Sequence, residues 1–471
     1  MTTDQRLRFI WMRWGTRLLP FADVTSEDLP WSRLLRLSLF QISVGMAVVL
    51  LVGTLNRVMI VELHVPTSLV AIMVGMPLLF APLRALVGFR SDHHRSELGW
   101  RRVPYIWMGT LMQFGGFSIM PFALLVLAGL GESSQAPVWV GQLATGVAFL
   151  LVGAGMHTTQ TVGLALATDL SPPDKQANVV GFLFVMMLLG MIGSALLFGD
   201  WLSDFSPGRL VQVVQAAALI TIVLNVVAMW KQEARSRGRK PGVEPDPSFT
   251  QSWQRFVQGD DAWRRLCVVG LGTMAFAMED VLLEPYGGEI LQLSVASTTL
   301  LTATLASGSL LGFVWASHWI SRGGHALRVA AWGCVCGLPA FMLIILAASM
   351  DASMDASMDI GQTLFSTGTF LIGLGSGLFA HGTLTASMNL APKSQVGLAM
   401  GAWGAVQATS AGVALVLGGV LRDLMASITS SSTGYWFVYS IEWLLLVLTL
   451  WAMQPLLHSR VSPLSAHTSS T

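Results

Sequence analysis

Long apolar stretches recur from one end of this chain to the other, and they constrain its fold more than any other feature. A helix that crosses a membrane needs about 20 largely apolar residues. Twelve stretches meet this need, numbered spans 1 to 12 in chain order: 36–60, 66–87, 103–129, 138–167, 177–199, 208–230, 265–290, 295–319, 326–349, 361–388, 395–421 and 434–457. Only 11% of the residues are charged, against about 25% in soluble domains. The sequence therefore predicts an all-α integral membrane protein with 12 transmembrane helices.

The distribution of basic residues predicts the orientation of these helices. Of the 27 Lys and Arg residues, only Arg57, Arg209 and Arg422 lie on the side that we predict to be external. Membrane proteins carry an excess of Lys and Arg in their cytoplasmic loops, so we expect both termini in the cytoplasm. The formal net charge of +1 does not indicate a nucleic-acid partner.

An internal repeat divides the chain into two halves. Residues 153–199 align without a gap with residues 373–419, so that Gly153 pairs with Gly373 and Gly155 with Gly375. Spans 4 and 5 then correspond to spans 10 and 11, as in transporters built from duplicated halves. The predicted organisation is as follows: an amphipathic cytoplasmic segment at 1–32, an N-terminal six-helix half at 33–230, a cytoplasmic linker with a short surface helix at 231–263, a C-terminal six-helix half at 264–458 and a cytoplasmic tail at 459–471. The tetrapeptide repeat at 348–359 is predicted to be an insertion in an external loop.

Two central spans carry polar and charged residues at membrane depth, where each is a candidate functional residue because charge is costly there. Span 1 has Asn56, Arg57 and Glu62, and span 7 has Glu279, Asp280 and Glu284. Pro285, Gly287 and Gly288 are predicted to interrupt span 7. We expect Arg57 to pair with Asp280 or Glu284; the alternative is that these residues lie in headgroup water.

Three histidines lie within or near the predicted spans: His157 in span 4, His381 in span 10 and His318 at the end of span 8. A neutral imidazole can ligate the magnesium of a chlorin pigment or relay protons, and the alternative is a hydrogen-bonded histidine inside the bundle. The sequence shows no phosphate-binding loop, protease helix motif or nucleophile elbow. We therefore expect neither an enzyme nor a metal site.

The loop after span 2 contains Gly88, Asp92, Gly99, Arg101 and Arg102. This pattern resembles the loop motif of the major facilitator superfamily, although residues 93–98 are additional. The resemblance implies a cytoplasmic latch between neighbouring helices. An acid at a helix N-terminus beside guanidinium groups can form a breakable charge network, and ordinary cytoplasmic positive charge is the alternative.

Longer strings in spans 1 and 7 carry a more specific resemblance. They are the residues 33–41, 53–63 and 278–288, together with 19–23 before span 1. With these strings the chain resembles the PucC and LhaA family, the bacteriochlorophyll delivery branch of the major facilitator superfamily. The preceding N-terminal segment is more similar to LhaA, which serves the core antenna; PucC, which serves the peripheral antenna, is the alternative.

The resemblance implies a role in the cytoplasmic (intracytoplasmic photosynthetic) membrane of a purple phototrophic bacterium. Members assist the assembly of light-harvesting antennae and are thought to bind or deliver bacteriochlorophyll; carotenoid is a second candidate pigment. The implied partners are antenna polypeptides, the reaction-centre core complex, pigment-synthesis enzymes, the protein-insertion machinery and membrane lipids.

Two functions from different classes therefore remain open. The first is a non-enzymatic assembly factor that binds pigment. The second is a proton-coupled secondary transporter of a small solute, with Glu279, Asp280 and Glu284 as proton sites. A pigment synthase is a third, for which the sequence shows no catalytic set.

Overall fold

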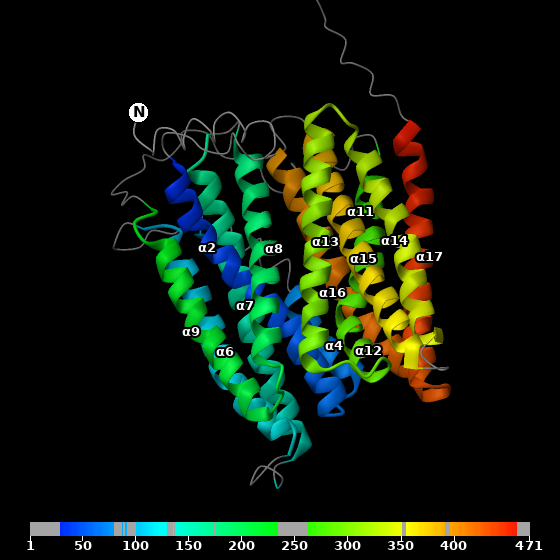
Figure 1. Cartoon of the computed structure of the whole chain (residues 1–471). Coiled ribbons are helices and arrows are strands. Elements are labelled where there is room, and N and C mark those ends of the chain that lie inside the picture. Colours follow the sequence, from blue (N-terminus) through cyan, green and yellow to red (C-terminus); the bar gives the residue numbers. More distant parts are fainter. Residues whose placement is uncertain are drawn as a thin grey trace, which may run out of the picture.

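Long helices run side by side along one axis of the molecule (Figure 1). The computed structural model describes residues 29–79, 87, 90–91, 100–129, 135, 137–172, 175–233, 261–350, 355–390 and 396–458, and within these ranges it contains helices and no strands. Residues 1–28 of the predicted N-terminal segment, residues 234–260 of the predicted linker and the tail from 459 lie outside the described residues.

The elements follow the predicted spans closely. Those of the first half are α2 (Trp31–Val48), η1 (Val49–Thr54), α3 (Leu55–Arg57), η2 (Val58–Glu62), α4 (Thr67–Leu79), α6 (Val103–Leu127), α7 (Val138–Asp169), α8 (Gln176–Trp201) and α9 (Pro207–Met229). Those of the second half are α11 (Ala262–Ala277), η4 (Glu279–Val281), α12 (Leu283–Glu289), α13 (Val295–Ser321), α14 (Ala326–Met350), α15 (Asp355–Leu390), α16 (Val396–Ile428) and α17 (Ser431–His458). Among the described residues, eleven helical segments are long and apolar enough to cross a membrane, and Thr67–Leu78 is a shorter apolar helix in the place of span 2. The protein is thus a multi-pass membrane protein.

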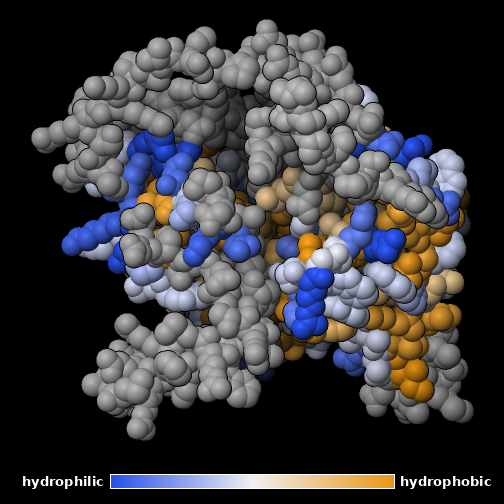
Figure 2. Space-filling model, turned by 90° about the horizontal axis from the view of Figure 1, so that it is seen from above, coloured by the Kyte–Doolittle hydropathy of each residue, from blue (hydrophilic) through white to orange (hydrophobic). Residues whose placement is uncertain are grey.

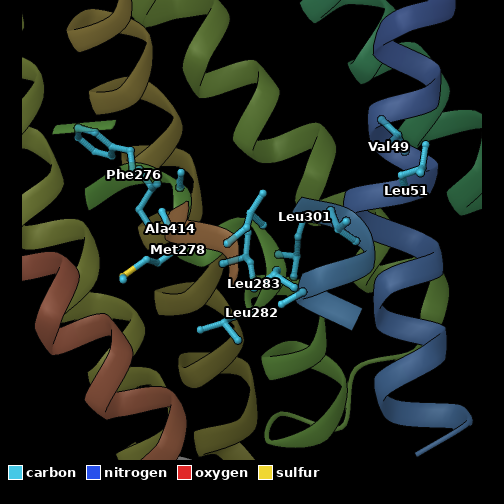
Figure 3. Close-up of a cluster of buried hydrophobic side chains, with 14 of the residues drawn as sticks. Val49, Leu51, Phe276, Met278, Leu282, Leu283, Leu301 and Ala414 are labelled. Atoms are coloured by element: carbon cyan, nitrogen blue, oxygen red, sulfur yellow. The ribbon is translucent and has the colours of Figure 1, made fainter. Parts of the chain in front are cut away.

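Spans 1 and 7 lie at the centre of the bundle. In the most apolar stretch of span 1, 83% of the residues are buried, and in that of span 7, 72%, against 28–50% in the other long spans. Figure 3 shows the buried side chains around them, among them Val49 and Leu51 of span 1, Leu282 and Leu283 of span 7, and Leu301 of α13. These two spans therefore have little surface left for lipid.

Besides the central spans, two long helix pairs join the halves, α4 with α16 and α8 with α13. In terms of spans these pairs are 2 with 11 and 5 with 8, and each becomes the other when the halves are exchanged. This approximate two-fold relation agrees with the repeat at an offset of six spans. The residue boundaries of the two halves remain predictions.

The glycines of the repeat pack in equivalent ways. A Cβ on Gly155 of α7 would lie 2.5 Å from the carbonyl oxygen of Gly109 on α6, and one on Gly375 of α15 would lie 2.7 Å from that of Gly333 on α14. Helices can approach this closely only where a side chain is absent. Since α6 is span 3 and α14 is span 9, each glycine meets the equivalent neighbour.

The tetrapeptide repeat departs from the prediction of a loop over 348–359. Helix α14 continues to Met350 and α15 already begins at Asp355, while residues 351–354 lie outside the described residues. The repeat is built from Ala, Ser, Met and Asp. Ala and Met favour helix, so both flanking helices extend into it.

We call the end of the bundle that carries Arg33, Arg101 and Lys231 the basic end; it is the end that we predict to be cytoplasmic. Figure 2 looks onto this end, where hydrophilic side chains gather, while hydrophobic ones lie along the flank. The exposed large apolar residues include tryptophans: Trp31, Trp107, Trp139, Trp230, Trp263, Trp315, Trp319, Trp332 and Trp451. Tryptophan is common where a membrane meets water.

Candidate functional site

The central helix of the second half is broken inside the membrane-spanning region. Its α-helix ends at Ala277, a 3-10 turn follows at Glu279–Val281, and α12 begins at Leu283. Pro285 has no backbone N–H, so it cannot bond the carbonyl oxygen of Val281 four residues earlier. Span 7 is thus interrupted as predicted, although Pro285, Gly287 and Gly288 themselves lie within α12 and the break comes one turn before them.

Asn56 of span 1 hydrogen-bonds the carbonyl group of Val281, which has no partner in its own helix at this break. Its side-chain amide donates to the carbonyl oxygen of Val281 at 3.0 Å, and also to that of Val52 in its own span at 2.8 Å. Irregular backbone at membrane depth is tolerated only where other groups satisfy it. Asn56 is therefore a structural partner of the broken helix, and it is fully buried.

Arg57 forms its ion pair within its own span, with Glu62. Its Nη2 also donates to the carbonyl oxygen of Leu293 beyond span 7, at 3.1 Å. The expected pair with Asp280 or Glu284 is wrong, since the described residues contain no such ion pair. The physical reason is that Val58–Glu62 is π-helical, and a π-turn aligns residues five apart, which brings Glu62 to the same face as Arg57.

Glu284 is buried between the two central spans. It accepts a hydrogen bond from the hydroxyl of Thr302 on α13. The backbone of Gly53 in span 1 lies against its carboxyl group, so that a Cβ at position 53 would collide with it. Its second oxygen, Oε2, is buried and has no hydrogen-bond partner among the described residues.

Glu442 of α17 completes the support of the broken helix, and the sequence analysis did not single it out. Its Oε1 accepts the backbone N–H of Glu279 at 2.7 Å, and the residue is fully buried. Glu279 is buried beside it, while Asp280 is half-buried. An acidic residue inside an apolar span was the signal that could have revealed Glu442.

A second charged cluster lies where α12 ends. Arg422 of α16 pairs with Glu289 at 2.5 Å and with Asp423 at 3.0 Å, and its guanidinium lies 4.6 Å from the centre of the Tyr435 ring. The hydroxyl of Tyr435 donates to Glu289 at 2.8 Å. Asp423 accepts the backbone N–H of Ser68 at 2.7 Å, so this cluster also ties span 11 to the start of span 2.

The predicted latch is partly described. Arg101 and Arg102 both contact Asp169 at the end of α7, the second at 3.1 Å, and Arg102 donates to the hydroxyl of Ser91 at 2.7 Å. The backbone N–H groups of residues 101–103 donate to Glu233 at 2.8–3.0 Å. The two arginine side chains therefore share one acid, Asp169, while Glu233 binds the backbone; neither acid was among the predicted latch residues. Gly88, Asp92 and Gly99 lie outside the described residues.

The three candidate histidines lie apart from the broken helix. His157 is buried in α7, while His318 in α13 and His381 in α15 are half-buried. The His381 ring centre lies 4.2 Å from that of Phe313, and its Nδ1 is buried with no hydrogen-bond partner within the described chain. A free nitrogen suits a pigment ligand, but the described lining of the cavity at the start of α2 and α6 includes no histidine. Pigment ligation remains a prediction.

The chain shares its fold with bacterial membrane transporters of known structure. Its structure is similar to that of a bacterial homologue of the human lysosomal transporter Spinster in an inward-facing, unoccupied conformation. The TM-score is 0.65 at 15% identity, with 93% of this chain and 100% of that chain covered. This likeness confirms the predicted fold class.

The sequence comparisons assign the family. A family model described as PUCC protein matches residues 54–461. The chain is 60% identical over 412 residues to the protein named Protein PucC of Rhodovulum sulfidophilum, covering 87% of this chain and 89% of that one. It is also 26% identical over 425 residues to the Bacteriochlorophyll synthase 44.5 kDa chain of Rhodobacter capsulatus, covering 89% and 94%. The chain belongs to the PUCC protein family, as the strings in spans 1 and 7 predicted; its preference for LhaA remains a prediction.

Proposed function

We propose that this protein is an assembly factor of the bacterial photosynthetic apparatus. In the cytoplasmic membrane it binds bacteriochlorophyll or delivers it to light-harvesting antenna polypeptides. The observation that carries the proposal is membership of the PUCC family over residues 54–461. The core antenna around the reaction centre is the more specific expectation, and carotenoid is a further candidate cargo.

The central contacts support an assembly factor over a transporter. Glu442 is engaged by the backbone of the broken helix, Arg57 by Glu62, and Glu284 by Thr302. With the bond of Asn56 to Val281, the contacts of Glu442 and Glu284 hold spans 1, 7, 8 and 12 together, which suits a rigid scaffold. A pigment with a long apolar tail would reach such a scaffold from the lipid, along its exposed apolar flanks, and would not need a central path.

The alternative is a proton-coupled transporter of a small solute. The observation that favours it is a set of buried carboxyl groups at the centre, on Glu279, Glu284 and Glu442, each with one oxygen that has no hydrogen-bond partner within the described residues. Buried acids of this kind serve as proton relays in membrane transporters.

Deletion of the gene from its native host distinguishes between these two functions. We expect membranes of the deletion strain to lose antenna absorption while total pigment synthesis and solute uptake continue. Accumulation of an unfinished pigment precursor would instead indicate an enzyme. Unchanged antenna absorption would contradict the assembly function.

A second experiment tests the pigment directly. Tagged protein purified in mild detergent from native membranes should carry bacteriochlorophyll and antenna polypeptides. If His381 is a ligand, His381→Phe should lower the pigment content, whereas His325→Phe, which replaces a histidine outside the candidate set, should leave it unchanged. A colourless protein without antenna polypeptides would favour the transporter, and proton-coupled uptake would then be measured.

A further inference from the structure

A cavity of about 1160 Å³ opens at the basic end, between the start of α2, the start of α6 and the end of α9. Its described lining comprises Ser32, Arg33, Arg36, Trp100, Val103, Pro104, Trp107, Val226, Met229, Trp230, Lys231, Gln232 and Glu233. Tryptophan, methionine and valine form the apolar part, while basic residues from two helices lie at the same site. The cavity is thus amphipathic, and it is remote in sequence from the broken helix of span 7.

This cavity faces the side of the bundle. Trp107 is 38% exposed and Trp230 is 59% exposed. Along the same two helices Leu111 and Val223 are also exposed, which is the pattern of helices whose outer faces contact lipid. Figure 1 shows α6 and α9 together at the outer side of the first half. A ligand could therefore enter laterally from the membrane.

The charge of the cavity is positive. In its described lining, Arg33, Arg36 and Lys231 face a single acid, Glu233. Both oxygens of Glu233 already accept backbone N–H groups at the start of α6, at 2.8–3.0 Å, and Arg33 donates to the side chain of Gln232 at 3.1 Å.

Two of these cations lack an acidic partner. Neither Arg36 nor Lys231 forms an ion pair with any described residue, and the buried Nε of Arg36 has no hydrogen-bond partner there. The cavity therefore offers two positive charges to a ligand that carries negative charge.

We propose that this cavity binds a membrane phospholipid with an anionic headgroup. The phosphate would lie at Arg36 and Lys231, and the glycerol and upper acyl chains would lie against Trp107, Trp230 and Met229. Basic pockets between membrane helices on the cytoplasmic side bind anionic headgroups, and tryptophans anchor at the same depth. An inorganic phosphate ion would fill only a small part of the cavity and would not contact its apolar lining.

The test is native mass spectrometry of the full-length protein with phosphatidylglycerol or phosphatidylcholine added in equal amounts. We expect the wild type to retain phosphatidylglycerol preferentially, and the double variant Arg36→Gln with Lys231→Gln to bind it about thirtyfold more weakly. The matched control is Arg209→Gln with Arg322→Gln, which removes the same charge from two exposed positions outside the cavity. This control should bind as the wild type does.

Equal retention by the double variant and the wild type would overturn the proposal. Lys231 is exposed, so Lys231→Gln alone provides the test if replacing Arg36 impairs folding, and it should weaken binding about fivefold. A photo-crosslinker in place of Trp230 should capture lipid in native membranes. Capture of an antenna polypeptide, or of residues 1–28 of the same chain, in place of lipid would also contradict it.

Discussion

Asn56 and Glu442 each bring one side-chain group to the backbone at the break in span 7. The amide of Asn56 donates to the carbonyl of Val281, and the carboxyl group of Glu442 accepts the N–H of Glu279. In lipid no water is present to replace either partner. At the scale of single residues, the broken helix is thus held by two polar side chains from other spans.

Replacing Glu442 should show what this support contributes. Glu442→Leu leaves the N–H of Glu279 unpaired and should lower the free energy of unfolding by about 1–3 kcal/mol. Glu442→Gln keeps an acceptor oxygen and should cost less. The measurement is unfolding of the purified protein in a denaturing-detergent titration; equal losses for both variants would contradict the assigned hydrogen bond.

A double-mutant cycle should confirm the partner of Arg57. We expect Arg57→Met and Glu62→Gln to couple by about 0.5–3 kcal/mol in the free energy of unfolding. The cycle with Glu284→Gln should show a smaller coupling, because Glu284 bonds Thr302. A larger coupling with Glu284 would restore the pairing predicted from the sequence.

The sequence predicted which positions carry buried polar side chains. It was less successful in predicting the partners of these side chains. Charge and amide groups inside apolar spans identified Asn56, Arg57, Glu279 and Glu284, and all four are buried. The break lies one turn before Pro285 because this residue has no N–H to bond the carbonyl oxygen of Val281. The ion pair of Arg57 could not be predicted, because the π-helical turn that aligns Glu62 leaves no pattern in an apolar stretch.

At the scale of elements, glycines set how closely helices pack. Gly155 brings α7 against α6, whereas nothing lies within 4 Å of the position where a Cβ on Gly146 of the same helix would stand. The repeat alignment predicted the equivalence of Gly155 and Gly375. It could not predict which helix each one meets, since that depends on the tertiary arrangement.

This contrast within α7 supplies a matched pair of variants. Gly155→Ala should lower the thermal unfolding midpoint in detergent, because its methyl group would meet the backbone of Gly109. Gly146→Ala should leave the midpoint unchanged or raise it slightly, since Ala favours helix over Gly by about 1 kcal/mol. Equal behaviour of the two variants would contradict the close contact of α6 and α7.

Helix α6 is capped by a residue far along the chain, Glu233, which accepts three consecutive backbone N–H groups. Glu233→Ala should cost about 0.5–2 kcal/mol and speed amide hydrogen exchange at residues 101–103. Glu233→Gln keeps one acceptor oxygen and should have an intermediate effect. Unchanged exchange in Glu233→Ala would show that the cap does not form in the membrane.

At the scale of the whole molecule, the halves meet through α4 with α16 and α8 with α13. Gly199 of α8 lies against Leu300 of α13, and its repeat partner Gly419 of α16 lies against Ala71 of α4. A transporter of this fold rocks one half against the other, so this interface must rearrange in each cycle. An assembly factor can work with the interface closed.

A covalent lock across this interface therefore separates the two functions. A Cβ on Gly75 of α4 would lie 3.6 Å from the Cβ of Leu415 on α16, within the range of about 3.5–4.5 Å that a disulfide requires. In a background without Cys267, Cys334 and Cys336, oxidised membranes carrying Gly75→Cys and Leu415→Cys should retain antenna polypeptides and pigment on the purified protein. The single-cysteine variants are the controls, and loss of both partners on oxidation, reversed by reduction, would favour the transporter.

The local partners of span 1 have a consequence for biosynthesis. Val281 follows Asn56 by 225 residues, which at about 5–20 residues per second takes the ribosome roughly 10 to 45 s. During this interval span 1 is already in the bilayer without span 7. Asn56 can meanwhile bond Val52 and Arg57 can pair with Glu62, both within five residues. Span 1 thus carries partners within its own sequence, which can satisfy two polar groups in lipid before the second half is made.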